Sequence, residues 1–265
     1  MKKHLLKLSS FASMPLVSLA AISCSNNQNI PPRDYEMIDQ NYGLAFNSEG
    51  KITKYYYFSD KGNDYTNIVI PEYLENNRIL TSQYYGYRQR ITWIGGAVFS
   101  AETKYDVDTG KYEPKYNDYA QYLTNITLPN SIEIIGGYAF QETPLTQIVL
   151  PDSVVDIGFG AFENCKNLES VKLSKNTKYI GSSAFRGTAI TCIKIPNSVN
   201  YIEFDAFRNT KLSGILTIPD SILEISSGAF LDTQITEVSI PNKDFYIAFD
   251  AFPPGCKITK RPLRT

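Results

Sequence analysis

The sequence predicts a repeat solenoid built mostly of β-strands, because three features recur along the chain at a nearly fixed spacing. Each unit ends in a phenylalanine, which returns at every twenty-second or twenty-third position from Phe140 to Phe252. Most units also carry a short run of alternating apolar residues before a proline, and a polar turn pair after it. A fixed period of this length is the signature of stacked coils.

Residues 190–207 show what each position in the unit does. Ile193 and Ile195 alternate with polar neighbours, so one face of a short strand is apolar. Pro196 ends that strand because it has no N–H to donate to a ladder. A second extended segment at 199–202 crosses the back, and the phenylalanine fills the inside. One unit cannot bury its own apolar face, so the coils must stack, with rings about 4.8 Å apart.

The proline motif identifies a resemblance that covers about residues 42–256. The motif resembles the BspA-like family of bacterial leucine-rich repeats in the segments Leu128-Pro129-Asn130-Ser131-Ile132, Leu150-Pro151-Asp152-Ser153-Val154 and Ile218-Pro219-Asp220-Ser221-Ile222. The resemblance implies a short right-handed leucine-rich-repeat-like solenoid of about seven coils, each one such period long. It also implies exposure at the bacterial surface and adhesion to host or matrix proteins.

The amino terminus has the features of a lipoprotein signal. A basic start is followed by a mostly apolar stretch at 8–22, which is short for a membrane span. The stretch ends Ala21-Ile22-Ser23-Cys24, which resembles a bacterial lipobox, and a polar segment follows to residue 34. We therefore expect lipid on Cys24 and a chain tethered to the outer face of the cell membrane. The alternative is an ordinary signal peptide with Cys24 incidental.

The remaining chain divides by pattern into a cap, an irregular first repeat and regular repeats. Residues 42–58 read as a hairpin, with a turn at 47–50, that shields the first strand edge. The basic end around Lys260 and Arg261 is interpreted as a solubilising cap. The predicted divisions are signal peptide 1–23, lipidated Cys and tether 24–34, β cap 35–67, first repeat with two insertions 68–122, regular repeats 123–252, and C-terminal cap 253–265.

Two tyrosine-rich insertions interrupt the first repeat. Insertions in repeat proteins become loops, often on the binding side, and tyrosine gives adaptable loops a large contact area. The alternative is that the insertions pack on the cap or serve as padding. Within the second insertion, residues 108–111 read as a hairpin turn, and their spacing fails that of a calcium loop. The candidate binding residues are Tyr84, Tyr85, Tyr87, Arg88, Tyr112, Tyr116 and Tyr119.

The repeat pattern also assigns an inside and an outside. The predicted core is a column of phenylalanines, namely Phe99, Phe140, Phe162, Phe185, Phe207, Phe230 and Phe252. From residue 123 we expect the coils to run without gaps. The opposite face of the first strand ladder is a mixed polar surface suited to a broad contact. Its concave-face candidates are Asn125, Gln147, Lys172, Lys194 and Glu237.

Several function classes are excluded or disfavoured. His4, the only histidine, lies in the segment expected to be removed, so histidine-dependent catalysis and His-ligated metals are excluded. A net charge of −1 argues against nucleic-acid binding. Cys165 stands where other units have threonine and is expected to be packed, Cys192 to be exposed, and neither to be a nucleophile. No metal or cofactor is expected, and the sequence indicates no oligomeric state.

These observations predict a lipid-anchored surface protein that is not an enzyme. The favoured function is non-catalytic binding, as adhesion to a protein or glycan of a host or neighbouring cell. The alternative is a structural or antigenic coat protein without a fixed ligand. A substrate-capturing lipoprotein or an enzyme is a weaker third hypothesis.

Overall fold

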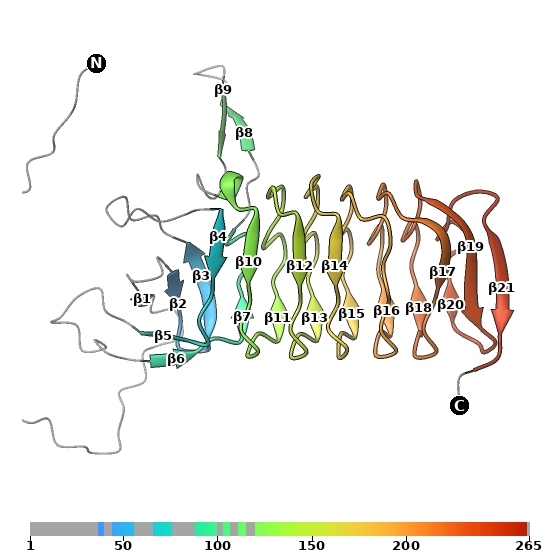
Figure 1. The fold of residues 1–265 in the computed structure, drawn as a ribbon, viewed down its shortest axis with the longest axis horizontal. Helices are drawn as coiled ribbons and strands as arrows, with labels where there is room; N and C mark the ends of the chain where they lie inside the picture. The colour runs from blue at the N-terminus through green and yellow to red at the C-terminus, as the bar shows by residue number, and fades with distance from the viewer. Residues whose placement is uncertain are drawn as a thin grey trace, which may run out of the picture.

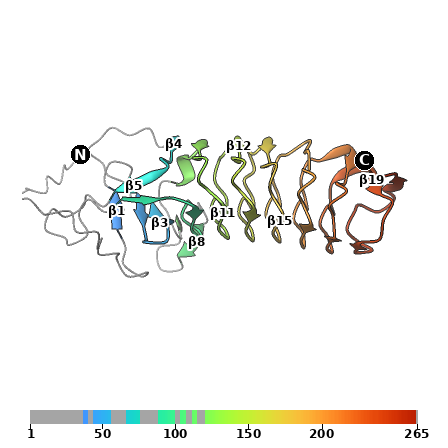
Figure 2. The same cartoon turned by 90° about the horizontal axis from the view of Figure 1, so that it is seen from below.

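The computed structural model describes residues 37–39, 44–55, 66–75, 88–99, 103–106, 111–114 and 120–263. Within them the chain forms an elongated β-solenoid, whose coils lie side by side along one axis (Figure 1). The same row of coils is visible from β11 to β19 in the perpendicular view (Figure 2). The described part holds one short helical turn, the 3-10 helix Ala120–Tyr122. The predicted repeat solenoid is confirmed.

The second extended segment of every coil builds one continuous sheet of ten strands. From β3 onward every pairing in it is parallel, and the buried isoleucine of each strand faces that of the next, as Ile135 faces Ile157. The strands are β1 (Met37–Asp39), β2 (Leu44–Phe46), β3 (Lys51–Tyr55), β7 (Trp93–Ile94), β11 (Ile134–Ile135), β13 (Asp156–Ile157), β15 (Tyr179–Ile180), β16 (Tyr201–Ile202), β18 (Glu224–Ile225) and β20 (Tyr246–Ile247).

The segment before each proline forms a second, interrupted set of parallel strands, which we call the first ladder. It consists of three short sheets, β4–β10, β12–β14 and β17–β19–β21. Their strands are β4 (Asn67–Val69), β10 (Asn125–Thr127), β12 (Gln147–Val149), β14 (Ser170–Lys172), β17 (Ser213–Thr217), β19 (Gln234–Pro241) and β21 (Lys257–Arg261).

From residue 123 the coils follow one another without an insertion, as predicted, but the short strand expected around Ile193 and Ile195 is not formed. Residues 189–198 of the fourth regular coil contain no strand, and residues 192–195 make no backbone-to-backbone hydrogen bond. A single bond, from Ser213 N to Thr191 O at 3.3 Å, links this stretch to the next coil. The coils on either side do form strands, so this gap lies between β14 and β17. The first ladder is also broken between β10 and β12, but there both coils form strands.

The phenylalanine column lies inside the coils, as predicted. Neighbouring ring centroids from Phe99 to Phe252 are 5.2–5.3 Å apart, and the interplanar angles do not exceed 12°. Six of the seven rings are fully buried, and Phe252 at the end is 8% exposed. These rings and the isoleucines of both strand sets form one hydrophobic core along the molecule. Their burial is the main source of stability in the stack.

The amino-terminal hairpin is confirmed. β2 and β3 pair antiparallel around a turn in which Asn47 Oδ1 accepts hydrogen bonds from the backbone N–H groups of Glu49 and Lys51, at 3.0 and 3.1 Å. β3 then pairs parallel with β7, with Ile52 opposite Ile94. The hairpin therefore covers the edge that the first coil would otherwise expose.

Both insertions contain antiparallel strand pairs. β5 (Tyr73–Glu75) pairs with β6 (Arg88–Arg90), and β8 (Thr103–Asp106) pairs with β9 (Lys111–Pro114). The predicted hairpin of the second insertion is confirmed by the pairing of Asp106 with Lys111. At the other end of the chain, β21 adds the closing strand to the first ladder.

Candidate functional site

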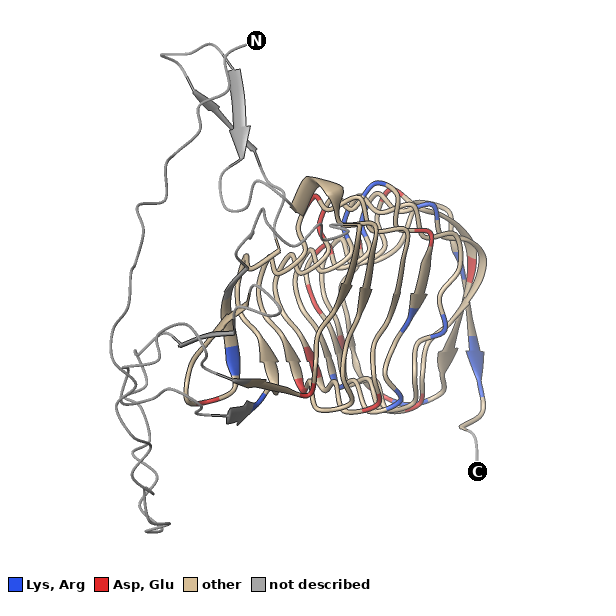
Figure 3. Ribbon diagram, turned by 60° about the vertical axis from the view of Figure 1, so that its left-hand side comes forward, with Lys and Arg blue, Asp and Glu red and all other residues tan. Residues whose placement is uncertain are grey.

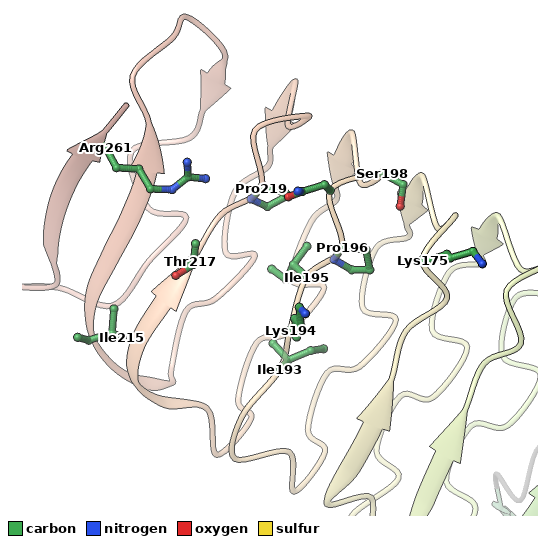
Figure 4. Close-up of a pocket in the computed structure, with 11 residues that line it drawn as sticks. Lys175, Ile193, Lys194, Ile195, Pro196, Ser198, Ile215, Thr217, Pro219 and Arg261 are labelled. Atoms are coloured by element: carbon green, nitrogen blue, oxygen red, sulfur yellow. The ribbon is translucent and has the colours of Figure 1, made fainter. Parts of the chain in front are cut away.

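The gap in the first ladder contains a groove of about 760 Å³, which we call the ladder groove. Figure 4 shows its walls, with Ile193, Lys194 and Ile195 on one coil and Ile215 and Thr217 on the next. Arg261 reaches the groove from β21, beyond β19. The lining residues are Lys175, Ile193, Lys194, Ile195, Pro196, Asn197, Ser198, Ile215, Thr217, Pro219 and Arg261.

The walls of the groove combine polar backbone with apolar side chains. Because residues 192–195 make no ladder bonds, their N–H and C=O groups have no backbone partner beside the groove. Ile215 on the facing wall is 69% exposed, and Ile193 is only partly buried against the core. Unpaired main-chain groups beside apolar side chains are what an extended ligand needs for hydrogen bonds and contact area.

Three cationic side chains line the groove, and they differ in how they are held. Lys175 Nζ lies 2.8 Å from Asp152 Oδ2, and the hydrogen bonds from Lys175 lower the pKa of that carboxyl. Arg261 Nη1 lies 2.6 Å from Asp220 Oδ1. Lys194 is exposed and forms no ion pair with any residue in the described ranges. Lys194 is therefore the cation in the groove whose charge no carboxylate of the described chain offsets.

Charged residues of both signs are interspersed around the coils, and basic residues mark β21 at the carboxyl end (Figure 3). The five concave-face candidates all lie on the first ladder or in its gap. Four of them are on strands β10, β12, β14 and β19, at Asn125, Gln147, Lys172 and Glu237. Of the five, only Lys194 lines the ladder groove. Glu237 lies 3.7 Å from Lys257 and accepts a hydrogen bond from Thr259 Oγ1 at 3.2 Å.

Sequence reasoning missed most of the groove. Arg261, interpreted as part of a solubilising end, is instead a structural residue, since its Nη2 donates to Ile218 O at 2.6 Å and its side chain is only 17% exposed. Its partner carboxylate, Asp220, stands almost two repeats earlier in the chain, so no local pattern points to it. Asn197 and Ser198 belong to a turn pair that recurs in several coils, so the sequence does not single them out. They differ from the same residues of other coils only in lying beside the gap, and the gap can be seen only in the folded chain.

Most of the tyrosine candidates lie outside the described residues. These are Tyr84, Tyr85, Tyr87, Tyr116 and Tyr119, and Cys24 lies outside as well. Arg88 and Tyr112 lie in β6 and β9, respectively.

The three cysteines within the described residues are free thiols. Cys165 is fully buried, its Sγ lies 3.0 Å from Phe140 O, and burial raises the pKa of its thiol to about 12. Cys192 is exposed, as predicted. Burial followed by the negative charge of Glu237 raises the pKa of the half-buried Cys256 thiol.

No three His, Cys, Asp or Glu side chains in the described ranges converge on a point where an ion could bind. None of the helical structure in the same ranges is long and apolar enough to cross a membrane.

The architecture is that of a leucine-rich-repeat solenoid, and a comparison with family profiles assigns it more narrowly. Residues 115–213 match the BspA type leucine rich repeat region in 6 copies. This region of the chain is therefore similar to BspA type leucine rich repeats, and the resemblance drawn from the proline motif is confirmed there. A search of curated proteins found no match.

Solved structures with similarity to the chain are all distant. A leucine rich cell surface protein of Faecalibacterium prausnitzii is 19% identical, with 86% of this chain and 76% of that chain covered and a TM-score of 0.34. The leucine rich repeat protein of T. pallidum is 17% identical, with coverages of 88% and 83% and a TM-score of 0.39. The pneumococcal vaccine antigen PcpA is 16% identical, with coverages of 86% and 88% and a TM-score of 0.35.

Proposed function

We propose that the chain is a non-catalytic binding module, displayed at the bacterial surface, that captures a protein or glycan of a host or neighbouring cell in the ladder groove. The observation that carries this proposal is the groove itself, because it lies where residues 192–195 form no strand and leave polar backbone without backbone partners. Leucine-rich repeat proteins of this type generally serve as binding scaffolds and not as enzymes.

The chemistry of the groove favours an elongated ligand that carries negative charge. The charge of Lys194 is not offset by a described carboxylate, while Lys175 and Arg261 add positive charge at two other points of the lining. A carboxylate or sulfate on the ligand could pair with Lys194. The exposed side chain of Ile215 supplies apolar contact beside it.

The proposal is tested by screening the full chain against an array of host proteins and glycans, and by comparing two charge reversals on any ligand captured. Lys194→Glu should abolish capture, because it places a repulsive charge in the groove. Lys172→Glu makes the same change in β14, on the same ladder but outside the lining residues, and should leave capture intact. Equal loss in both variants would contradict the groove as the contact. An array with no saturable ligand would instead favour the coat-protein alternative.

We further propose that lipid on Cys24 holds the chain on the outer face of the cell membrane. The lipobox-like motif and the polar segment after it support this proposal. Cells fed a labelled fatty acid should incorporate the label into the wild-type chain but not into Cys24→Ser, which should leave the membrane fraction. A wild-type chain whose Cys24 is unmodified by mass spectrometry would refute the anchor.

The tyrosine-rich insertions are proposed as a second contact. Replacing Tyr84, Tyr85 and Tyr87 together with Ser should abolish capture and leave the melting curve unchanged, if the insertion is the binding loop that the sequence predicts, since surface substitutions change stability little. Full-strength capture by this triple variant would remove the insertions from the proposal and leave the groove as the contact.

A further inference from the structure

The outer face of the ten-stranded sheet carries exposed aromatic side chains and carboxylates. Tyr179, at the centre of the sheet, is 42% exposed, and its ring stacks on that of Tyr201 with centroids 5.0 Å apart. Farther along, Phe204 and Tyr246 are 59% and 61% exposed. Clustered exposed aromatic residues mark interaction sites more often than isolated ones do.

Among the outward side chains from β15 to β20, three are tyrosines and one is not aromatic. Tyr201, Glu224 and Tyr246 are opposite one another on the adjacent strands β16, β18 and β20 (Figure 1). A tyrosine in the middle position would continue the 5.0 Å stacking of the preceding pair. Glu224 stands there instead, so the flanking tyrosines belong to strands that are two ladder spacings apart, roughly 10 Å.

A hollow of about 250 Å³ lies beside Glu224, and we call it the aromatic slot. Phe204 comes from the coil before it and Tyr246 from the coil after it, while the middle coil supplies the carboxylate and two small hydroxyl side chains. Ser226 Oγ donates to Glu224 Oε1 at 3.0 Å, which holds the carboxylate in place. The lining residues are Phe204, Glu224, Ser226, Ser227 and Tyr246.

The charge around the slot has one sign. The segments 201–205, 224–228 and 246–250, which form this part of the face, contain Glu203, Asp205, Glu224 and Asp250 and no Lys or Arg. Among these, Asp205 is paired with Arg208 at 3.5 Å, and Asp250 accepts a hydrogen bond from Ser227. An aromatic ring face attracts a cation, and a guanidinium group can also stack on such a ring and pair with a carboxylate.

We propose that the aromatic slot binds a cationic side chain, an arginine or lysine presented by a protein partner, with the ring faces of Phe204 and Tyr246 beside the cation and Glu224 as its counter-ion. Arginine is expected to bind better than lysine, because its planar group can stack on a ring and pair with the carboxylate at once. This second site lies on the opposite sheet from the ladder groove and does not depend on the function proposed above.

The test is a titration of the isotope-labelled full chain with the peptide acetyl-Gly-Arg-Gly-amide, followed by amide chemical shifts. The control peptide carries citrulline, which has nearly the shape of arginine without its charge. Saturable shifts are expected at residues 201–204, 224–227 and 246 with the arginine peptide only. Equal shifts with citrulline, or no shifts with either peptide, would overturn the proposal. Equal or larger shifts with a methyl glucoside would also overturn it, in favour of a sugar platform.

Paired variants separate the slot from the rest of the face. Glu224→Gln removes the charge and keeps the shape, and should weaken arginine-peptide binding about tenfold. Asp156→Asn makes the matching change in the same outward row, three strands from β18, and should have no effect on binding. Tyr246→Leu keeps apolar volume but removes the ring face, and should weaken binding severalfold. Unchanged affinity in Glu224→Gln, or equal weakening in Asp156→Asn, would contradict the assignment.

Discussion

In most coils, the residue three positions after the buried phenylalanine is a threonine whose hydroxyl closes the turn with a hydrogen bond. Thr143, Thr188, Thr210 and Thr233 each donate a hydrogen bond to the carbonyl of the preceding phenylalanine at 2.8–3.0 Å. Cys165 occupies the same position in its coil but contacts Phe140 O of the previous coil instead. Its identification as a small packed residue, made from the repeat alignment alone, is confirmed.

The first prediction concerns the reactivity of the thiols. Iodoacetamide at pH 8 should alkylate Cys192 within minutes and leave Cys165 unmodified in the folded chain, because only the thiolate reacts and burial raises the pKa of Cys165 to about 12. Peptide mapping by mass spectrometry measures both sites. In denaturant the two should react at similar rates. Rapid labelling of Cys165 in the native chain would show that its coil opens.

The raised pKa of Cys165 also predicts a dependence of stability on pH. The unfolded chain loses this proton near pH 8.5, its ordinary value, while the folded chain keeps it until about pH 12. The unfolded state therefore binds fewer protons in this range, and the free energy of unfolding should fall as pH rises. Cys165→Thr, which restores the residue of neighbouring coils, should remove that loss. Parallel pH profiles of the two chains, from denaturant melts, would contradict the linkage.

The third prediction compares two positions in the phenylalanine column. Phe185→Ala should lower the free energy of unfolding by about 3–5 kcal/mol, because it removes a buried ring and leaves a cavity between Phe162 and Phe207. Phe252→Ala should cost clearly less, since that ring has one stacked neighbour in the column and is 8% exposed. Urea denaturation measures both. A loss below about 1 kcal/mol for Phe185→Ala would be incompatible with the stacked core.

At the scale of single elements, β21 is held to the stack by side-chain contacts of Arg261 as well as by its backbone hydrogen bonds to β19. Arg261 crosses β19 to reach Asp220 and Ile218 O, and both charged side chains are at most 20% exposed. Arg261→Gln should therefore leave a poorly compensated carboxylate and lower the free energy of unfolding by about 1–3 kcal/mol. Arg264→Gln is the control. Hydrogen exchange should show faster exchange in β21 and β19 of Arg261→Gln, and unchanged protection there would contradict a bracing role.

The two strand sets were not equally predictable from the sequence. The parallel part of the ten-stranded sheet follows from the isoleucine that stands five residues before each phenylalanine of the column, because each such isoleucine has to enter the core. The gap in the first ladder could not be foreseen, since Phe185 and Pro196 are as far apart in the sequence as Phe140 and Pro151. The spacing and the alternation are the same in both coils. Whether neighbouring strands come close enough to pair is decided by packing between coils, which no single repeat encodes.

The candidate sites were less predictable than the fold for a related reason. Lys194 was found because it alternates with core residues, but the other cations of the groove come from a turn and from β21. The aromatic slot depends on Glu224 standing between two tyrosines on neighbouring coils, one repeat before it and one repeat after it. Aligning the repeats would have placed these three in one row. The hollow beside them requires the folded side chains.

Taken as a whole, the molecule has two long faces of different chemistry on one core. The first ladder presents polar residues and the cations of the ladder groove, while the ten-stranded sheet presents aromatic rings and carboxylates around the aromatic slot. Each coil contacts mainly its neighbours, as the parallel pairings between successive coils show. The core residues point inward from both faces. The outward residues of one face can therefore differ from those of the other without changing the core.

The same independence predicts that the chain tolerates the loss of one whole coil. Deleting residues 141–162 removes one full period and joins Phe140 to Glu163. Phe140 should then stack on Phe185, and Ile135 should pair with Ile180, because every coil repeats the same register. The shortened chain should retain β-sheet circular dichroism and a cooperative melt. It should melt at a lower temperature, since one interface between coils is lost.

The matched control deletes residues 141–151, which is half of that period. This shorter deletion removes β12 and keeps β13. The segments that follow then lose their register with the preceding coil, and apolar residues become exposed to solvent. It should therefore be the more damaging change, although it removes fewer residues. A whole-coil deletion that unfolds the chain as fully as the half-coil deletion would contradict a stack stabilised by neighbour contacts. It would indicate instead that stability depends on interactions along the entire molecule.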